Sequence, residues 1–274
     1  MMIAKGIPCI PDGIEINKES LKKQEAAFLK VLNEIMEKAK EFDVTIRVIG
    51  SLAFRIKCPD YKYIEYENQH HLADIDFITY SKEIIKVQDL FFGLGWTENQ
   101  NILRLFGDKR RIFYHPDENI HSDIFIDKLR FCHEIDFKKR LKIDYPTVSL
   151  IDLLLGKLQI VEINKKDLVD TMVLLSQFPI SKIGNNTDEI DGHYLAKLCS
   201  EDWGWWKTAT SNIEKTRKFT NECFAKNDAN KVKEKLDTLS RLIEEKPKSL
   251  KWKIRSKIGE KMKWYREVEE VERG

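Results

Sequence analysis

The strongest constraint on the fold is a change of pattern at Pro146. Before this residue, short runs rich in β-branched and aromatic side chains alternate with helical patterns, whereas after it every patterned segment has helical spacing. The later helices are expected over 149–162, over 165–177 and in several segments between 191 and 266. Because strands are confined to the first half, we predict an α+β fold with a helical C-terminal region.

The length of 274 residues allows one large domain or a domain with an appendage. Turn-forming residues gather in the segment "FPISKIGNNTDEIDG", which marks a candidate boundary near residue 180. We therefore expect one domain over 1–180 and a helical region over 181–274.

The first half contains segments with a clear period. Apolar residues recur at helical spacing within 18–42 and again within 82–95. Strands are expected in "VTIRVIG", which ends at Gly50, and in "ADIDFITY". A strand pair is expected in "RRIFYHP" and "NIHSDIFID", joined by the turn "PDEN".

The composition narrows the classes of function and the compartment. The formal net charge of +2 is close to neutral, so affinity for nucleic acid has to come from a local basic patch. No apolar run is long enough to cross a bilayer, and the N-terminal residues lack the apolar core of a signal peptide. The five cysteines form no CxxC pair. These features predict a cytoplasmic protein.

Aspartates occupy alternate positions on the predicted strand "ADIDFITY". The period of two places Asp74 and Asp76 on one face, while Ile75 and Phe77 point to the other. Neighbouring carboxylates repel each other, and a bound Mg²⁺ or Mn²⁺ relieves that repulsion. The alternative is a strand end with two solvated aspartates.

A third carboxylate favours the metal site. Asp123 lies on another predicted strand, in "HSDIFID", although Asp127 shares its face and leaves the register open. Three aspartates on neighbouring strands can hold two metal ions about 4 Å apart, as in-line phosphoryl or nucleotidyl displacement requires. At the preceding strand-to-helix turn, Gly50 and Ser51 present backbone N–H groups and a hydroxyl that suit a phosphate.

This constellation resembles the DNA polymerase beta-type nucleotidyltransferase superfamily over about residues 20–178. The shared features are an apolar strand, then Gly-Ser, then "DID", then a third acidic strand. The resemblance implies a mixed sheet flanked by helices and Mg²⁺-dependent transfer of a nucleoside monophosphate from an NTP to a hydroxyl. It assigns metal binding to Asp74, Asp76 and Asp123, and phosphate binding to Gly50 and Ser51.

The later part looks like the abortive-infection toxin type of nucleotidyltransferase. That type has a helical lysine followed by a basic-Asp-x-x-Asp motif, which here corresponds to Lys157 and to "KDLVD" with Asp167 and Asp170. The segments "HSDIFIDKLRFCHEI" and "DWGWWKT" are also similar to a group of bacterial and archaeal nucleotidyltransferase-like proteins. A toxin-like or RNA-modifying role follows by analogy only.

The sequence departs from the family pattern in one insertion. Twenty-two residues separate Ser51 from Asp74, and their segment "KCPDYKYIEYENQHH" is expected to form a loop or lid. Its adjacent histidines, His70 and His71, are expected to be a solvated pair, with contact to a nucleotide as the alternative.

Lys157 lies in the apolar stripe of its own predicted helix. With Leu150 at zero and about 100° per residue, Leu154 falls near 40°, Val161 near 20° and Lys157 near −20°. An ammonium in this position needs an anionic partner. Either Lys157 forms an ion pair with Asp170 that docks two helices, or it binds the triphosphate and the charge that develops on it.

Positive charge is concentrated near the end of the chain. The segment 246–266 contains nine Lys or Arg and a single acid, Glu260, with Trp252 and Trp264 interleaved. It is either a solvated helical face or a docking surface for RNA, in which lysines contact phosphates and tryptophans stack on bases. The tryptophans of "DWGWW" are expected to anchor the helical half to the core, with a platform for bases as the alternative.

These observations predict an enzyme, a metal-dependent nucleotidyltransferase that uses an NTP and Mg²⁺ or Mn²⁺ and releases pyrophosphate. The acceptor is a hydroxyl group, and RNA is the candidate for the molecule that carries it. The alternative is a non-catalytic nucleotide- or RNA-binding module that keeps the nucleotidyltransferase fold.

Overall fold

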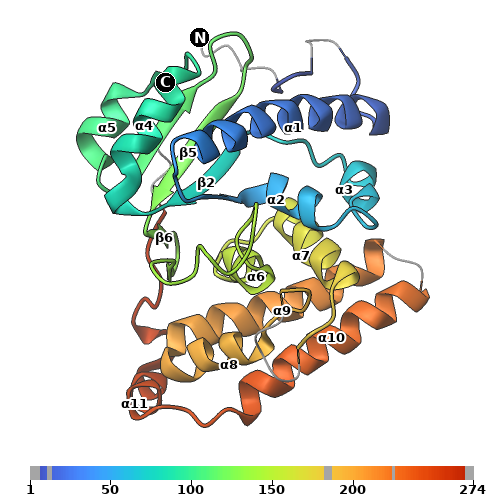
Figure 1. Ribbon diagram of the computed structural model, residues 1–274. Helices are drawn as coiled ribbons and strands as arrows, with labels where there is room; N and C mark the ends of the chain where they lie inside the picture. Colours follow the sequence, from blue (N-terminus) through green and yellow to red (C-terminus); the bar gives the residue numbers. More distant parts are fainter. Residues whose placement is uncertain (1–6, 11–13, 182–186, 224–225, 269–274) are drawn as a thin grey trace. The chain divides into compact units, whose positions relative to one another are not determined.

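The computed structural model describes residues 7–10, 14–181, 187–223 and 226–268 (Figure 1). The chain divides into two compact units, each discontinuous in sequence. Unit 1 comprises 1–128 and 136–149, and unit 2 comprises 129–135 and 150–274. The prediction of an α+β protein with a helical C-terminal region is confirmed.

Unit 1 is built on a mixed five-stranded sheet in the order β1-β2-β5-β4-β3. The neighbours β2 and β5 are parallel, while the other pairs are antiparallel. The last segment of unit 1 returns to the outer edge of β1, where Val48 and Thr147 form a parallel bridge. The strands are β1 (Ile46–Ile49), β2 (Ile75–Thr79), β3 (Thr97–Glu98), β4 (Arg110–Tyr114) and β5 (His121–Ile126).

Two helices of unit 1, Lys18–Glu41 and Ile84–Gly93, lie where helical spacing predicted them, whereas Tyr63–Glu67 and Gln100–Phe106 were not predicted. The longest, α1, starts at a capping box in which Asn17 accepts from the backbone of Ser20 and the Ser20 hydroxyl accepts from the backbone of Asn17. Its apolar face is buried, including Phe28 and Ile35. These helices are α1 (Lys18–Glu41), α2 (Gly50–Lys57), α3 (Tyr63–Glu67), the 3₁₀ turn Ser81–Glu83, α4 (Ile84–Gly93) and α5 (Gln100–Phe106).

The insertion between Gly-Ser and the first aspartates is not a solvated loop. It contains the short helix α3, whose side chains Ile64, Glu65 and Tyr66 are buried. The expectation of a loop or lid was therefore wrong for this stretch, because Glu65 pairs with Arg55 of α2 and Lys62 pairs with Glu25 of α1.

Unit 2 is helical apart from a two-stranded sheet of β6 (Lys128–Arg130) and β7 (Glu134–Asp136), whose first and last residues are counted with unit 1. Helices α8, α9 and α10 pack against one another, and α6 and α7 pack against them in turn (Figure 1). The bounds are α6 (Leu150–Leu158), α7 (Lys165–Gln177), α8 (Gly192–Glu201), α9 (Trp203–Cys223), α10 (Lys226–Glu245), α11 (Leu250–Ile258) and the 3₁₀ turn Gly259–Lys261.

The division between the units differs from the boundary expected near residue 180. It falls between residues 149 and 150 because α6 and α7 share a core with the later helices. Residues 182–186 of the expected linker lie outside the described part of the chain.

Among the described residues, no helix combines the length and the apolar character that crossing a membrane requires.

Candidate metal and nucleotide site

The acidic strands predicted from the sequence are neighbours in the sheet. Strand β2 pairs in parallel with β5, and the register places Asp76 directly opposite Asp123. Ile75 and Phe77, on the other face of β2, are fully buried. Parallel neighbours bring the starts of both strands to the same edge, so Asp74, which precedes β2, lies at this edge too. We call Asp74, Asp76 and Asp123 the acidic edge.

A histidine completes a cluster of potential ligands at this edge. Nε2 of His121 lies 3.6 Å from Oδ2 of Asp74. One ligand atom from each of Asp74, His121 and Asp123 lies within 4.8 Å of the other two. Opposite ligands of an octahedral Mg²⁺ are about 4.2 Å apart, so small side-chain rotations would bring these atoms to bonding distance. Carboxylates suit Mg²⁺ or Mn²⁺, and the imidazole nitrogen shifts the preference towards the transition metal.

Asp76 is held differently from the other two aspartates. Its carboxylate packs on Gly50, where a β-carbon would lie 3.0 Å from Cγ of Asp76 and closer still to Oδ2. Gly50 also has a φ of +70°, which side-chain-bearing residues rarely adopt. The close approach at Gly50 is therefore made by a carboxylate of the protein, and Gly50 fixes the position of Asp76 relative to the start of α2.

Arg110 forms a two-pronged ion pair with Asp123. Its Nη2 donates to Oδ2 at 2.6 Å and its Nε to Oδ1 at 3.2 Å. The guanidinium also lies over the ring of Phe125, 5.3 Å from its centroid. Asp123 is 1% exposed, so this contact neutralises a carboxylate that has almost no access to water.

The structure distinguishes Asp123 from Asp127 as the third acid. Asp127 follows the opposite end of β5, beyond the pairing of Thr79 with Ile126. Its φ is +59°, and its carboxylate accepts from the backbone of Ser81 at 3.0 Å. Asp127 therefore shapes a turn, and only Asp123 belongs to the acidic edge.

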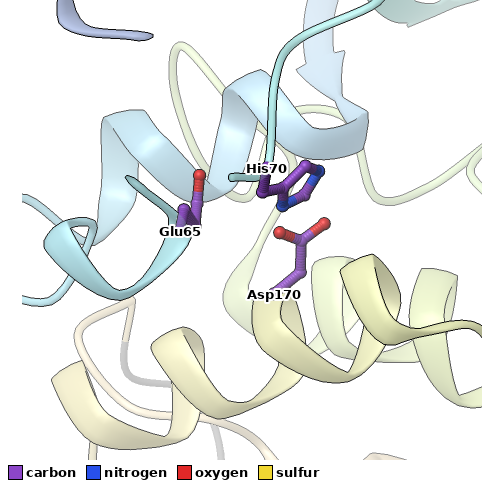
Figure 2. Close-up of side chains that lie close together, drawn as sticks. All are labelled: Glu65, His70 and Asp170. Carbon is purple, nitrogen blue, oxygen red and sulfur yellow. The ribbon is translucent and has the colours of Figure 1, made fainter. Parts of the chain in front are cut away.

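Ser51, in the first turn of α2, has a buried histidine beside it. Its hydroxyl lies 3.3 Å from Nε2 of His70, and His70 is 2% exposed. The expectation that His70 is solvated was wrong, because Arg55 donates to its carbonyl and its amide donates to Glu65. Figure 2 shows His70 in the stretch that follows Glu65 of α3.

Arg55 organises a buried charge cluster beneath this stretch. Its Nε donates to Glu65 at 2.6 Å and its Nη1 to Glu25 at 3.3 Å. Lys62 donates to the other oxygen of Glu25 at 2.6 Å, and the hydroxyl of Tyr66 also donates to Glu25. Burial, followed by the hydrogen bond to Glu25, raises the pKa of Tyr66 above its ordinary value. These contacts attach the insertion to α1 and α2.

In unit 2, Lys157 is paired with both aspartates of the "KDLVD" motif. Its Nζ lies 2.7 Å from Oδ2 of Asp170 and 2.9 Å from Oδ1 of Asp167. Asp170, labelled on α7 in Figure 2, is fully buried. Burial alone would lower the pKa of Lys157, but the two carboxylates more than offset this and hold the pKa above its ordinary value. Asp167 also completes the capping box of α7 with Asn164.

The basic segment 246–266 uses its tryptophans internally. The ring of Trp252 packs edge-to-face on Trp206 at 5.3 Å between centroids. Trp264 packs on Trp203 at 6.0 Å, and its Nε1 donates to Thr208 at 3.1 Å. The lysines of α11 are exposed. The tryptophans of "DWGWW" thus form an aromatic core within unit 2.

Sequence reasoning missed His121 and Arg110. His121 is two residues before Asp123 on one strand, so the period of two already placed it on the same face. Arg110 lies on the partner strand of the predicted pair, but its reach to Asp123 depends on the hairpin register, which the turn residues alone did not specify.

Comparison with known proteins finds no matching family model, no matching curated protein and no matching solved structure. The resemblance drawn from the motifs therefore stays a prediction, and the function is argued from the geometry of the acidic edge.

Proposed function

We propose that the protein is a metal-dependent nucleotidyltransferase with the nucleotidyltransferase fold. The observation that supports this most is the register of β2 and β5, which sets Asp76 opposite Asp123 with Asp74 and His121 alongside. Like charges on adjacent strands are unfavourable, so a protein that assembles three carboxylates here has a use for a cation.

In the proposed reaction, the oxygen of an acceptor hydroxyl attacks the α-phosphorus of an NTP, and pyrophosphate leaves. Asp74, Asp76 and Asp123 would hold Mg²⁺ or Mn²⁺, which when bound supplies charge stabilisation and acidifies the acceptor hydroxyl. Asp123 would receive the hydroxyl proton. The backbone N–H groups at the start of α2 and the Ser51 hydroxyl would bind phosphate oxygens. Lys157, with Asp167 and Asp170 orienting it, is proposed as a further phosphate contact.

The test is pyrophosphate release from each of the four NTPs with Mn²⁺ or Mg²⁺ and total RNA as acceptor. Asp123→Asn should abolish release, whereas Asp127→Asn should retain it. The Asp127 variant is a matched control because asparagine tolerates the positive φ and can still accept from Ser81. Equal activity of the two variants would contradict the assignment.

The alternative is a non-catalytic nucleotide-binding module. It is favoured by the ion pairs of Arg110 with Asp123 and of Lys157 with two aspartates, which already occupy groups that a catalyst needs. For this alternative, NTP binding without pyrophosphate release is the expected result under every metal tested.

For RNA as the acceptor, we propose that the segment 246–266 contributes through its charges. Lys251 and Lys263 line a hollow of about 870 Å³ beside α11 that also exposes aromatic rings. Replacing Lys251, Lys253 and Lys257 by Gln keeps the helix and removes three positive charges. If these lysines contact single-stranded phosphates, the slope of log K against log salt should become less negative by roughly 2.

A control with the same change in net charge separates local contact from overall attraction. Lys22, Lys30 and Lys86 are exposed on helices of unit 1, and their replacement by Gln should leave the slope unchanged. Fluorescence anisotropy with labelled RNA at several salt concentrations measures both. Equal slopes for the two triple variants would show that 246–266 is not the RNA surface.

A further inference from the structure

We propose that Arg110 is a built-in competitor of the divalent cation at the acidic edge. It neutralises Asp123 in the metal-free protein, and its ion pair has to open when a cation binds. This inference rests on the proposed function, since it concerns the regulation of the same site.

The geometry of the pair provides the first argument. Arg110 engages both oxygens of Asp123, through Nη2 at 2.6 Å and Nε at 3.2 Å. A cation bound to Asp123 at about 2.1 Å requires at least one of these oxygens along its lone-pair direction. The guanidinium and a divalent cation also repel each other. The two positive groups are therefore alternatives at this carboxylate.

The exposure of the partners decides which of them moves. The side chain of Asp123 is 1% exposed and lies on a central strand, whereas that of Arg110 is 17% exposed and starts from β4. The guanidinium can therefore turn towards water while the carboxylate stays in place. The contact of the guanidinium with the ring of Phe125 favours the return of Arg110 to Asp123 when the cation leaves.

The neighbouring arginine of the same strand is a natural control. Arg111 points to the other face of β4 and forms an ion pair with buried Glu98, to which Gln88 also donates at 2.7 Å. The side chains of Arg111 and Glu98 are 6% and 1% exposed, so this pair is at least as buried as that of Arg110. Because it points away from the acidic edge, a cation bound there would not compete with it.

The experiment measures Mn²⁺ binding by isothermal titration calorimetry and thermal melting with EDTA or with Mn²⁺. Arg110→Met should bind Mn²⁺ at least about tenfold more tightly than the unmodified protein, because the competitor is gone. Its melting temperature should fall in EDTA and recover in Mn²⁺. Arg111→Met should lose stability under both conditions, with an unchanged affinity for Mn²⁺.

A second variant covers the case in which Arg110→Met does not fold. Arg110→Lys keeps the charge but loses the two-pronged geometry, so it should bind Mn²⁺ more tightly than the unmodified protein, although less tightly than a folded Arg110→Met variant would. Equal or weaker Mn²⁺ binding by the Arg110 variants would overturn the inference and leave the metal site intact. Absence of Mn²⁺ binding to all the proteins, the unmodified one included, would overturn the proposed metal site together with the inference.

Discussion

Two clusters of carboxylates in unit 1 differ in how deeply their members are buried and in how they are paired. Around Arg55, the side chains of Arg55 and Lys62 carry two positive charges that match those of Glu25 and Glu65. At the acidic edge, Asp123 is buried against Arg110, whereas Asp74 and Asp76 are half-buried and Asp74 lies beside His121. A cluster whose charges balance can be complete as it stands, whereas three neighbouring carboxylates offer oxygen ligands to a cation. We therefore interpret the first cluster as structural and propose the second as the functional site.

The largest effect is expected from breaking the balanced cluster. Arg55→Met removes the partner of two buried carboxylates and should lower the free energy of unfolding by about 3–5 kcal/mol. Urea denaturation followed by circular dichroism measures this. Arg47 is half-buried and donates to the carbonyls of Ile46 and Asp144, not to a carboxylate. Arg47→Met should therefore lower the free energy of unfolding markedly less than Arg55→Met. A similar small loss for both variants would remove the contrast between the clusters.

A variant of Lys157 tests whether its pairing with Asp167 and Asp170 in unit 2 is structural, like the cluster around Arg55. Lys157→Met removes the ammonium that pairs with Asp170 and Asp167 and should lower the free energy of unfolding by about 3 kcal/mol, the lower end of the range because Asp167 keeps some access to water. The double variant with Asp170→Leu should recover much of this loss. If instead the stability is unchanged and NTP affinity falls, Lys157 is a phosphate ligand rather than a structural partner.

His133 shows what burial does to a base without a close counter-charge. Burial lowers its pKa from 6.5 to about 4, an effect that Asp202 partly opposes and Arg266 reinforces. Between these values the unfolded chain binds a proton that the folded chain does not, so stability falls as the pH drops from 6.5 to 4. The loss should be roughly 3 kcal/mol, and His133→Gln should remove this dependence. Denaturant titrations at intervals across this pH range measure both proteins.

The smallest change in stability is expected at the acidic edge itself. Asp76→Asn relieves repulsion with Asp123, so the free energy of unfolding should stay constant or rise by up to about 1 kcal/mol. Binding of Mn²⁺, measured by calorimetry, should be lost. Asp89→Asn, at an exposed position of α4, serves as the control and should change neither quantity. Clear destabilisation by Asp76→Asn with retained metal binding would make the acidic edge structural.

Local patterns predicted the elements of this protein better than its contacts. The period of two identified β2 and β5, and helical spacing identified α1 and α7 closely. Lys157 was singled out correctly as a lysine that requires anionic partners. Each of these inferences depends on residues within a few positions of one another.

What the sequence did not reveal depends on distant partners. The insertion was expected to form a loop or lid because it is longer than an ordinary connection, but it contains α3, whose Glu65 is buried through its pairing with Arg55. The two charges compensate each other only in three dimensions. The boundary was expected at turn residues near 180, whereas it is set by where the helices after 150 find their core. Arg110 reaches Asp123 through a hairpin register that the turn sequence did not specify.

The discontinuity of the two units has a consequence for synthesis of the chain. Residues 129–135 belong to unit 2, and His133 hydrogen-bonds to Thr208, a partner 75 residues later. At about 5–20 residues per second on the ribosome, this piece waits roughly 4–15 s for its partner. During that time unit 1 can close around residues 136–149, where Val48 donates to the carbonyl of Pro146. Unit 1 is therefore expected to fold first, and a shortened chain that starts near residue 150 would leave unit 2 without His133 and the strand pair that flanks it.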